Sequence, residues 1–352
     1  MNRLKTHIEN IEKAARDWLR EDCEALREAV DKTIKMGSFS EMDIQYQLSV
    51  LRNNLQSGDI RTWIQKAGMT DIEPKRTSKV LCLHAGNLPL VGFQTALGVL
   101  LSGKNYYGKI SKKDPYLLTS FLEHMQRVGL DQEVKWSLQL ENFKELKANA
   151  VVFAGSESSV PEVKRAIRHL NAVGAKPKYL IRTAKLSVAY LNKVDKDILA
   201  DVAEGMIRYG GRGCRSVGAV ISTFSLSEVR NELAMAIRQK AETQALSNST
   251  HNLLDYQYAY NTAVEKEQVK CSGLLIEASD SLPDKDFSVS WIQGGIEELR
   301  AIVSNNRRLI QSIYTTNLKI DGLNVENLSE AQSPPLYWKP DGEDVIEFLT
   351  NI

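Results

Sequence analysis

The sequence has no strong excess of either charge and few residues that form covalent or metal cross-links. Its 45 Lys and Arg side chains nearly balance 44 Asp and Glu, which leaves a formal net charge of +1. The totals therefore give no sign of a nucleic acid or an acidic partner. The four cysteines lie far apart without a CxxC pair, and no two of the five histidines have metal-ligand spacing. These absences argue against a zinc site and a disulfide framework, and they fit a reducing cytoplasm.

Long hydrophobic runs and the common nucleotide motifs are absent as well. No apolar run approaches the roughly 20 residues of a membrane-spanning helix. The stretch from Met1 to Asp22 is charged throughout and does not resemble a secretory signal. Neither GxGxxG nor a P-loop is present, so neither common nucleotide-binding fingerprint identifies the function. We expect a cytoplasmic protein with no membrane span, no bound metal and no nucleic-acid partner.

The remaining composition is that of a folded protein of about two domains. The 352 residues are 43% hydrophobic and 25% charged, which is ordinary for globular proteins. Residues 3–34 repeat apolar side chains at helical spacing and predict one long amphipathic helix. Ser38 and Glu41 have the spacing of a capping box, which predicts a second helix from Ser38. A third helix is expected over residues 60–67.

From Val80 onward, short apolar strands alternate with helical patterns. Further strands are expected at 106–110, 134–140, 150–154, 178–181, 217–223, 274–278, 287–292 and 309–314. Helices are expected at 90–101, 114–128, 195–208, 226–244 and 296–304, with 249–270 largely helical. This alternation predicts an α/β fold with doubly wound parallel sheets. Ligands of such sheets bind beyond the carboxyl ends of the strands.

A glycine-rich turn that ends in one cysteine is the most distinctive segment of the chain. It reads YGGRGCRSVGAVIS over residues 209–222, and the glycines before Cys214 let the backbone approach a ligand closely. Arg208, Arg212 and Arg215 flank the thiol, and nearby cations lower a thiol pKa and make it a nucleophile. The alternative is a small buried cysteine beside a turn, a common role for a free thiol.

Three other sites lie at predicted strand ends, and each has an ordinary structural alternative. The Asn87 amide can donate to a developing oxyanion, although Asn before Leu-Pro also serves as a turn or helix cap. Lys109 can reach ribose hydroxyls or a phosphate, or it is a solvated edge lysine. Gly155 and Ser156 precede a helix, which is an anion-binding position and equally an ordinary cap.

In combination these segments resemble the aldehyde dehydrogenase superfamily. The order Asn-x-Pro, GKNYYGKIS, FAGSE and GRGC is similar to that family's Asn-aromatic-Pro turn, GN…KPS strand, FTGS turn and GQxC nucleophile segment. The length, the GGRGC form and the ending around residues 338–342 look more like acyl-CoA reductases of the LuxC type, the fatty-acid reductase components of bacterial luminescence operons and their relatives. The motifs cover residues 78–222, and the tail matches loosely.

The resemblance implies a role for each matching residue. Cys214 would be the nucleophile, and Asn87 would bind the oxyanion together with the backbone N–H of Cys214. Lys109 and Ser111 would contact the adenosine ribose. Gly155–Ser156 would line the diphosphate and nicotinamide side of the cofactor.

The resemblance also implies an aldehyde-dehydrogenase-like architecture with two doubly wound α/β domains. A helical segment at 1–75 would pack on the cofactor domain. The dinucleotide-binding domain would span 76–185 together with the tail from about 325 to 352. The catalytic domain, with Cys214, would span 186–324.

Two departures from the superfamily pattern bear on the reaction. The glutamate of LELGGK, which activates the water that hydrolyses an acyl-enzyme, has no counterpart in YLIRTAK, because residues 180–184 supply no carboxylate. Its absence disfavours oxidation to an acid and suits a thioester that leaves as an aldehyde. NAD-preferring members often carry Glu one place after the KPS serine, where this chain has Lys112, followed by Lys113. A cation there attracts a 2′-phosphate, so we expect NADPH, with NADH as the alternative.

We therefore expect an enzyme that reduces acyl-CoA to an aldehyde through an acyl-cysteine at Cys214. Two alternatives stay open: a non-catalytic acyl- or nucleotide-binding subunit of a biosynthetic complex, and cofactor-independent acyl transfer at the same cysteine. No general acid is identified, because a lone His84 at a strand end is usually structural. Arg212 and Arg215 are candidates for CoA phosphates or solvated side chains. The resemblance further implies a homo-oligomer and admits an acyl-protein synthetase or transferase as a partner.

Overall fold

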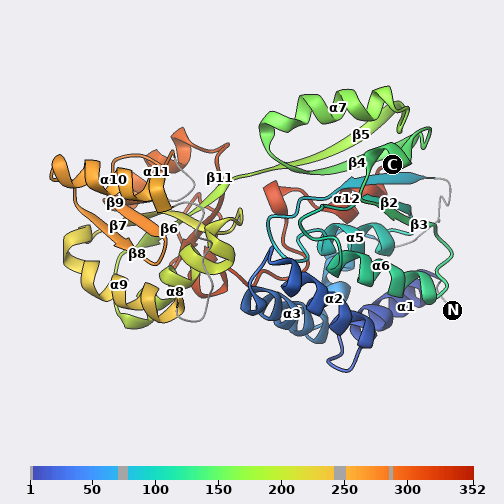
Figure 1. Ribbon diagram of the computed structural model, residues 1–352, viewed down its shortest axis with the longest axis horizontal. Coiled ribbons are helices and arrows are strands. Elements are labelled where there is room, and N and C mark those ends of the chain that lie inside the picture. Colours follow the sequence, from blue (N-terminus) through green and yellow to red (C-terminus); the bar gives the residue numbers. More distant parts are fainter. Residues whose placement is uncertain (1–2, 70–77, 242–250, 285–287) are drawn as a thin grey trace. The chain divides into compact units, whose positions relative to one another are not determined.

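The computed structural model describes residues 3–69, 78–241, 251–284 and 288–352, which form two compact units (Figure 1). The first unit comprises Met1–Thr183 and Pro335–Ile352, and the second comprises Ala184–Pro334. The chain thus returns to the first unit at Pro335, later than the expected position near 325. Residues 325–334 stay with the second unit, where β12 (Val325–Asn327) pairs with β11 (Ile310–Thr315).

The first unit is built on a five-stranded sheet in which every pair is parallel. The spatial order is β3-β2-β1-β4-β5. The bounds are β1 (Lys79–Leu83), β2 (Asn105–Lys109), β3 (Val134–Ser137), β4 (Ala148–Gly155) and β5 (Val173–Thr183). The strand order reverses between β1 and β4, and sheets of this kind bind ligands beyond the carboxyl ends of the strands at such a point.

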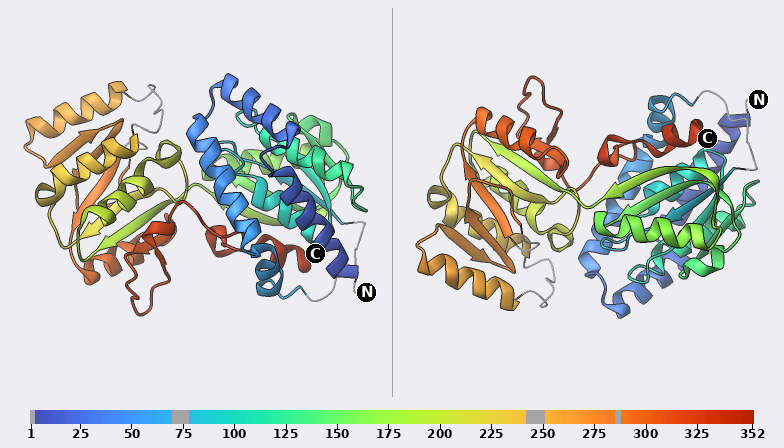
Figure 2. Two further views of the ribbon diagram at one scale, coloured as in Figure 1. Left: turned by 90° about the horizontal axis from the view of Figure 1, so that it is seen from below. Right: turned by 90° about the horizontal axis from the view of Figure 1, so that it is seen from above.

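Alternate residues of these strands face two different layers. Val80 and Cys82 pack into the core shared with α5 (Phe93–Leu101) and α6 (Leu117–Arg127). Leu81 and Leu83 face the opposite core, which contains residues of η1 (Leu140–Phe143) and α7 (Val160–His169). Figure 2 shows α7 on one side of this unit and the N-terminal helices on the other.

Four N-terminal helices and one C-terminal helix complete the first unit. They are α1 (Arg3–Trp18), α2 (Glu24–Met36), α3 (Glu41–Gln56), α4 (Asp59–Lys66) and α12 (Val345–Thr350). Two fully buried tryptophans tie them to the rest. Trp18 Nε1 donates to Ser120 Oγ on α6 at 3.1 Å, and Trp63 Nε1 donates to Asp344 Oδ2 before α12 at 2.6 Å. The helical region is therefore part of the core of this unit.

Two details of this region differ from the prediction. The expected single helix over 3–34 is divided, because the chain turns after Trp18, where Arg52 Nε donates to Leu19 O at 2.8 Å. The helix that is expected to begin at Ser38 is α3, which begins after Ser40, because the Ser40 hydroxyl accepts the Asp43 N–H at 3.1 Å. Arg52, which binds this turn, is distant in sequence, so helical periodicity alone does not predict the contact.

The second unit holds a seven-stranded sheet in the order β12-β11-β6-β7-β10-β9-β8. Its pairs are parallel except for β8 against β9. The remaining bounds are β6 (Leu186–Leu191), β7 (Val217–Ser222), β8 (Gln268–Cys271), β9 (Leu274–Ala278) and β10 (Ser288–Gln293). The helices are α8 (Lys196–Ile207), α9 (Leu226–Ala241), α10 (His251–Ala263) and α11 (Ile296–Asn305).

Helices cover both faces of this sheet as well. Residues of α8 and α9 share one core with β7 and β10, and α11 contributes to the core on the other face. The prediction of two α/β units with parallel sheets and leading helices is therefore confirmed. Residues 242–244, 249–250 and 287 of the predicted helices and strands lie outside the described residues.

Candidate active site

The loops that follow β1 and β2 pack against each other at the carboxyl edge of the first sheet. The His84 N–H donates to Lys109 O at 3.0 Å, just past the end of β1. Gly86 leaves no room for a side chain, because a Cβ there would lie 2.1 Å from Ser111 Oγ. Asn87 follows this glycine and is partly exposed. Asn87 therefore lies on a loop in direct contact with the end of β2, at Lys109, and with the residues that follow it, at Ser111.

Lys109 and Lys112 form a cationic site at the end of β2. Burial lowers the pKa of Lys109, and the charge of Lys112 lowers it further, whereas Glu141 acts in the opposite sense. Lys112 and Lys113 are exposed, and Ser111 Oγ accepts the Lys113 N–H at 3.2 Å. Two neighbouring ammonium groups beside a hydroxyl suit a phosphate ligand. Sequence patterns do not indicate Glu141, because η1 comes near this site only through the fold.

Gly155 and Ser156 lie at the carboxyl end of β4, the strand beside β1. Gly155 packs under an aromatic ring, since a Cβ would lie 2.5 Å from Phe153 Cζ. Ser156 is exposed, and its carbonyl accepts the Ser159 N–H at 3.1 Å in the turn that leads to α7. All predicted cofactor residues thus lie at the carboxyl ends of β2 and β4, on either side of β1.

His84 is buried in the core beneath this edge. Its Nε2 lies 2.7 Å from the Tyr106 hydroxyl, and its Nδ1 occupies the space that a side chain at Gly92 would need. Burial, with the charges of Lys109 and Arg182, lowers the pKa of His84 to about 3. The burial of His84, its contact with Tyr106 and its lowered pKa favour a structural histidine over a general acid.

Asp114 is a buried residue of this region that sequence reasoning did not single out. Its Oδ2 accepts the Leu90 N–H at 2.8 Å, and the carboxyl is only 4% exposed. Its other oxygen has no hydrogen-bond partner among the described residues. Burial raises the pKa of Asp114 to about 6, against the opposing hydrogen bonds from the backbone of Leu90 and Leu117. The sequence feature that could have pointed to Asp114 is the Asp-Pro pair before the predicted helix.

The end of β5 carries no acidic side chain of its own. Arg182 Nη1 donates to Thr95 Oγ1 at 3.1 Å, and the Thr183 N–H donates to Asp341 Oδ2 at 3.2 Å. The tail thus brings a carboxylate to this strand end that the strand sequence does not predict. That carboxylate accepts a hydrogen bond from the backbone.

In the second unit, Cys214 lies in a tight turn that leads into β7. The Ser216 N–H donates to Gly213 O at 2.9 Å, and the Gly213 N–H donates to Ser216 Oγ at 3.1 Å. The Cys214 carbonyl accepts the Ser187 hydroxyl at 2.9 Å, and the cysteine is partly exposed. The thiol is therefore on a turn whose backbone is held on both sides, and it is not a fully buried core residue.

The chain reaches this turn through three successive residues in the left-handed region. Tyr209, Gly210 and Gly211 have φ values of 57°, 66° and 70°. A Cβ at Gly211 would lie 2.9 Å from Met206 O, so this position requires glycine for space and for conformation. Tyr209 is buried although left-handed backbone disfavours a bulky residue. The glycine-rich sequence thus turns the end of α8 sharply toward the cysteine.

Two of the three arginines near Cys214 are engaged elsewhere, which corrects the expected ring of positive charge. Arg208 is buried and pairs with Glu204 at 2.5 Å. Arg215 is also buried, pairs with Glu326 at 2.8 Å and donates to Ala331 O at 2.6 Å. Arg215 is therefore neither a solvated side chain nor a free ligand for CoA phosphates. Arg212 is exposed.

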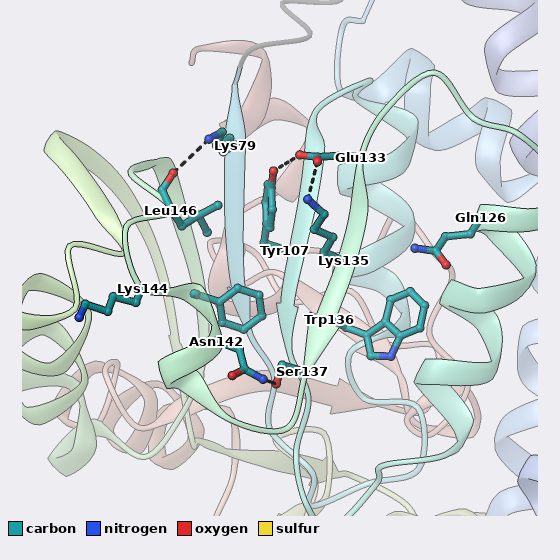
Figure 3. A pocket seen from close by; sticks show the side chains of 11 residues that line it. Lys79, Tyr107, Gln126, Glu133, Lys135, Trp136, Ser137, Asn142, Lys144 and Leu146 are labelled. Carbon is teal, nitrogen blue, oxygen red and sulfur yellow. Dashed lines mark hydrogen bonds and ion pairs between the residues drawn. The ribbon is translucent and has the colours of Figure 1, made fainter.

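A cavity of about 520 Å³ lies at the β3 edge of the first sheet (Figure 3). Its polar groups bind one another: Tyr107 donates to Glu133, Lys135 pairs with Glu133, and Asn142 Nδ2 donates to Ser137 Oγ at 2.7 Å. No predicted site residue is among those that line it. Because these polar side chains bond one another and no predicted site residue lines the cavity, we do not assign the active site to it.

Within the described ranges, no group of three or more His, Cys, Asp or Glu side chains could hold a metal ion. No helix among those residues is long and apolar enough to cross a bilayer.

Aldehyde dehydrogenases are among the solved structures that share this fold. KauB, an aldehyde dehydrogenase of Pseudomonas aeruginosa, matches with a TM-score of 0.64 and 12% identity over 90% of this chain and 72% of that one. Gox0499 gives 0.63 and 13% over 92% and 83%. A Mycobacterium tuberculosis aldehyde dehydrogenase complexed with NAD+ gives 0.59 and 14% over 88% and 73%. At these identities the likeness establishes an aldehyde-dehydrogenase-like fold.

The sequence itself gives the narrower assignment. It matches the family model of acyl-CoA reductase (LuxC) over residues 7–317, so the chain belongs to the LuxC acyl-CoA reductase family. No curated protein sequence matches it. The family and the fold together support an oxidoreductase that acts on acyl or aldehyde groups, as the motif resemblance predicted.

Proposed function

We propose that this protein reduces an acyl-CoA thioester to the aldehyde with NADPH, through a covalent acyl-cysteine at Cys214. The observation that carries the proposal is that Cys214 is a partly exposed residue on the Gly213–Ser216 turn and that its backbone carbonyl accepts the Ser187 hydroxyl. A thiol presented on a fixed backbone can attack a carbonyl repeatedly from one direction.

In the first step the Cys214 thiolate attacks the thioester carbonyl. The Asn87 amide and the Cys214 N–H donate hydrogen bonds to the oxyanion, and loss of one such donor costs about 2.7–4 kcal/mol of barrier in other enzymes. The oxyanion collapses, the bond to the CoA sulfur breaks, and CoA leaves as a thiolate that takes a proton from solvent.

The residues of the first unit fit a nicotinamide dinucleotide. Lys109, Lys112 and Ser111 offer cations and a hydroxyl at the end of β2, and Gly155–Ser156 gives an open turn at the end of β4. When bound, the reduced cofactor supplies the hydride that the acyl carbon accepts. Asn87 and the Cys214 N–H hold the resulting alkoxide on Cys214. Its collapse forms the aldehyde and returns the Cys214 thiolate.

The end of β5 supports release of an aldehyde instead of an acid. Residues 180–184 offer no carboxylate to activate water against the acyl-enzyme, and Asp341 is bonded to the Thr183 backbone. We propose that the acyl-cysteine therefore persists long enough to be reduced.

NADPH is the proposed cofactor because Lys112 adds a second cation next to Lys109. A 2′-phosphate between two ammonium groups gains charge-assisted hydrogen bonds that a 2′-hydroxyl does not. Comparable rates with equal low concentrations of NADH and NADPH would contradict this preference.

The test measures NADPH oxidation and CoA release with a panel of acyl-CoAs. Wild type, Cys214→Ala and Cys23→Ala are compared, because Cys23 is also partly exposed and controls for loss of a thiol elsewhere. Oxidation that requires acyl-CoA, persists in Cys23→Ala and vanishes in Cys214→Ala supports the proposal. CoA release without oxidation would favour acyl transfer at Cys214. No reaction of either kind would favour a binding subunit.

A further inference from the structure

The loop that carries Asn87 contains a strained residue three positions further on. Leu90 has a φ of 56° and is 2% exposed. Left-handed backbone is strained for a non-glycine residue, so it persists only where the surroundings hold it. The Leu90 carbonyl then accepts the Phe93 N–H at 2.9 Å, where α5 begins. The left-handed turn therefore sets the path of the chain between Asn87 and α5.

The group that holds this turn is a buried carboxyl from the next βα connection. Asp114 Oδ2 accepts the Leu90 N–H at 2.8 Å. Burying a carboxyl that has one oxygen without a partner among the described residues is unfavourable in itself. Two costly features, the left-handed leucine and the buried carboxyl, thus meet in one hydrogen bond. A hydrogen bond to a charged group is stronger than one between neutral groups, so this contact stabilises the strained backbone at Leu90.

On the basis of the proposed function, we propose that Asp114 is a positioning residue, which holds the Asn87 loop in place for oxyanion binding through its hydrogen bond to Leu90. The other end of the same loop is held by different contacts, the His84 N–H to Lys109 O and the packing of Gly86 on Ser111. Asn87, Leu88 and Pro89 lie between these two anchors, so we expect loss of the Leu90 anchor to shift the position of Asn87. A misplacement of about 1 Å can cost about 100-fold in rate.

A purely structural role at the start of α6 is the competing explanation, because a backbone hydrogen bond from Leu117 also acts on the Asp114 carboxyl. The two roles differ in what they affect. Acylation by acyl-CoA forms an oxyanion, whereas alkylation of Cys214 by iodoacetamide forms none. Loss of a positioning residue for Asn87 slows the first reaction and spares the second. A general loss of structure around the site would instead change the rates of both acylation and alkylation.

The experiment is a double-mutant cycle on Asp114 and Asn87 with CoA release in the first turnover as the readout. Asn87→Ala alone is expected to slow acylation by about 100-fold or more. Asp114→Ala is expected to slow it by at least about tenfold, with iodoacetamide alkylation of Cys214 unchanged. Because Asp114 acts through Asn87, the double variant should be no slower than Asn87→Ala. Asp114→Asn keeps an acceptor for the Leu90 N–H and should stay closer to wild type than Asp114→Ala.

Several outcomes would overturn the inference. Additive effects in the double variant, or equal slowing of acylation and alkylation, would show a structural role only. If Asp114→Ala fails to fold, Asp114→Ser replaces it. The serine side chain is one bond shorter, so its hydroxyl can still bond the backbone at the start of a helix but does not reach the Leu90 N–H as the carboxylate does. A wild-type acylation rate in Asp114→Ser would refute the positioning role. If wild type releases no CoA at all, the proposed function fails and this inference fails with it. A different result would refute the inference but leave the proposed function standing. In that case wild type acylates normally and Asn87→Ala is strongly slowed, but the effect of an Asp114 substitution adds to that of Asn87→Ala.

Discussion

The Arg215 guanidinium and the Glu326 carboxylate meet at 2.8 Å directly after the residue that we propose as nucleophile. Arg215 also donates to Ala331 O, and its own carbonyl accepts the Tyr314 hydroxyl at 3.3 Å. Ser312 Oγ donates to the other Glu326 oxygen at 2.7 Å. This network joins the cysteine turn to β11 and β12, so Arg215 is a structural clamp of the second unit.

Replacement of Arg215 by Gln is therefore expected to destabilise the protein. It leaves Glu326 without its cationic partner, and breaking a buried ion pair costs about 3–5 kcal/mol. The Glu326 side chain is 27% exposed, so we expect a value near the lower end of that range. Urea unfolding measures it, with Arg212→Gln as the matched control because Arg212 is exposed. A loss of less than 0.5 kcal/mol (about the effect of an ordinary surface substitution) in Arg215→Gln would contradict the clamp.

The four cysteines are expected to differ strongly in reactivity. Cys82 is fully buried, and burial raises its pKa far above the usual range of a thiol. Cys271 is buried as well, whereas Cys214 and Cys23 are partly exposed. Limited alkylation followed by peptide mass spectrometry should label Cys214 at least about tenfold faster than Cys82 and Cys271. Labelling of Cys23 at the rate of Cys214 would mean that exposure alone explains the reactivity of the proposed nucleophile.

His84 makes stability depend on pH on the acid side. Its pKa is lowered from 6.5 to about 3 by burial, so the unfolded chain binds a proton that the native protein excludes. The contribution of neutral His84 to the free energy of unfolding is fully present above pH 6.5. It falls as the pH drops toward 3, by an amount on the order of 4 kcal/mol. Urea unfolding between pH 7.5 and pH 5 should show a shallower loss in His84→Gln than in wild type. Parallel pH curves for the two proteins would contradict the buried, neutral state.

Asp114 changes the stability of the protein with pH in the direction opposite to His84, over a neighbouring pH range. Its pKa is raised from 3.8 to about 6, so the native protein holds a proton that the unfolded chain has released. Its unfavourable contribution is therefore largest above pH 6 and is relieved as the pH falls toward 3.8, by about 2–3 kcal/mol. Asp114→Asn should gain stability relative to wild type at pH 7.5 and lose that gain near pH 4.5. A pH-independent difference would mean that Asp114 does not titrate in this window.

The sequence sufficed for features that depend on residues close together along the chain. Alternating apolar strands and helices predicted both α/β units, and strand ends predicted where Asn87, Lys109 and Gly155–Ser156 lie. The glycine-rich segment predicted a turn at Cys214, and three successive left-handed residues lead into it.

Features that depend on distant residues were not predicted. Asp114 meets Leu90 across 24 positions, and Arg215 meets Glu326 across 111. Neither pairing leaves a periodic or motif signal, since ion pairs and single hydrogen bonds require only complementary side chains at the right place in space. For the same reason the sequence alone suggests free charge at Arg208 and Arg215, whose partners Glu204 and Glu326 are visible only in the fold.

Lys112 is expected to control the choice of cofactor. Lys112→Glu replaces a cation beside Lys109 with an anion, which repels a 2′-phosphate and can accept hydrogen bonds from ribose hydroxyls. The ratio of kcat/KM for NADPH to that for NADH should fall by at least about tenfold, a change of about 1.4 kcal/mol. The matched control is Lys113→Glu, which makes the same charge change one residue later, since Lys112 and not Lys113 is the cation that lowers the pKa of Lys109. Equal shifts in both variants would mean that general charge, and not the position of Lys112, determines the preference. An unchanged ratio in Lys112→Glu would assign the 2′-phosphate to other residues.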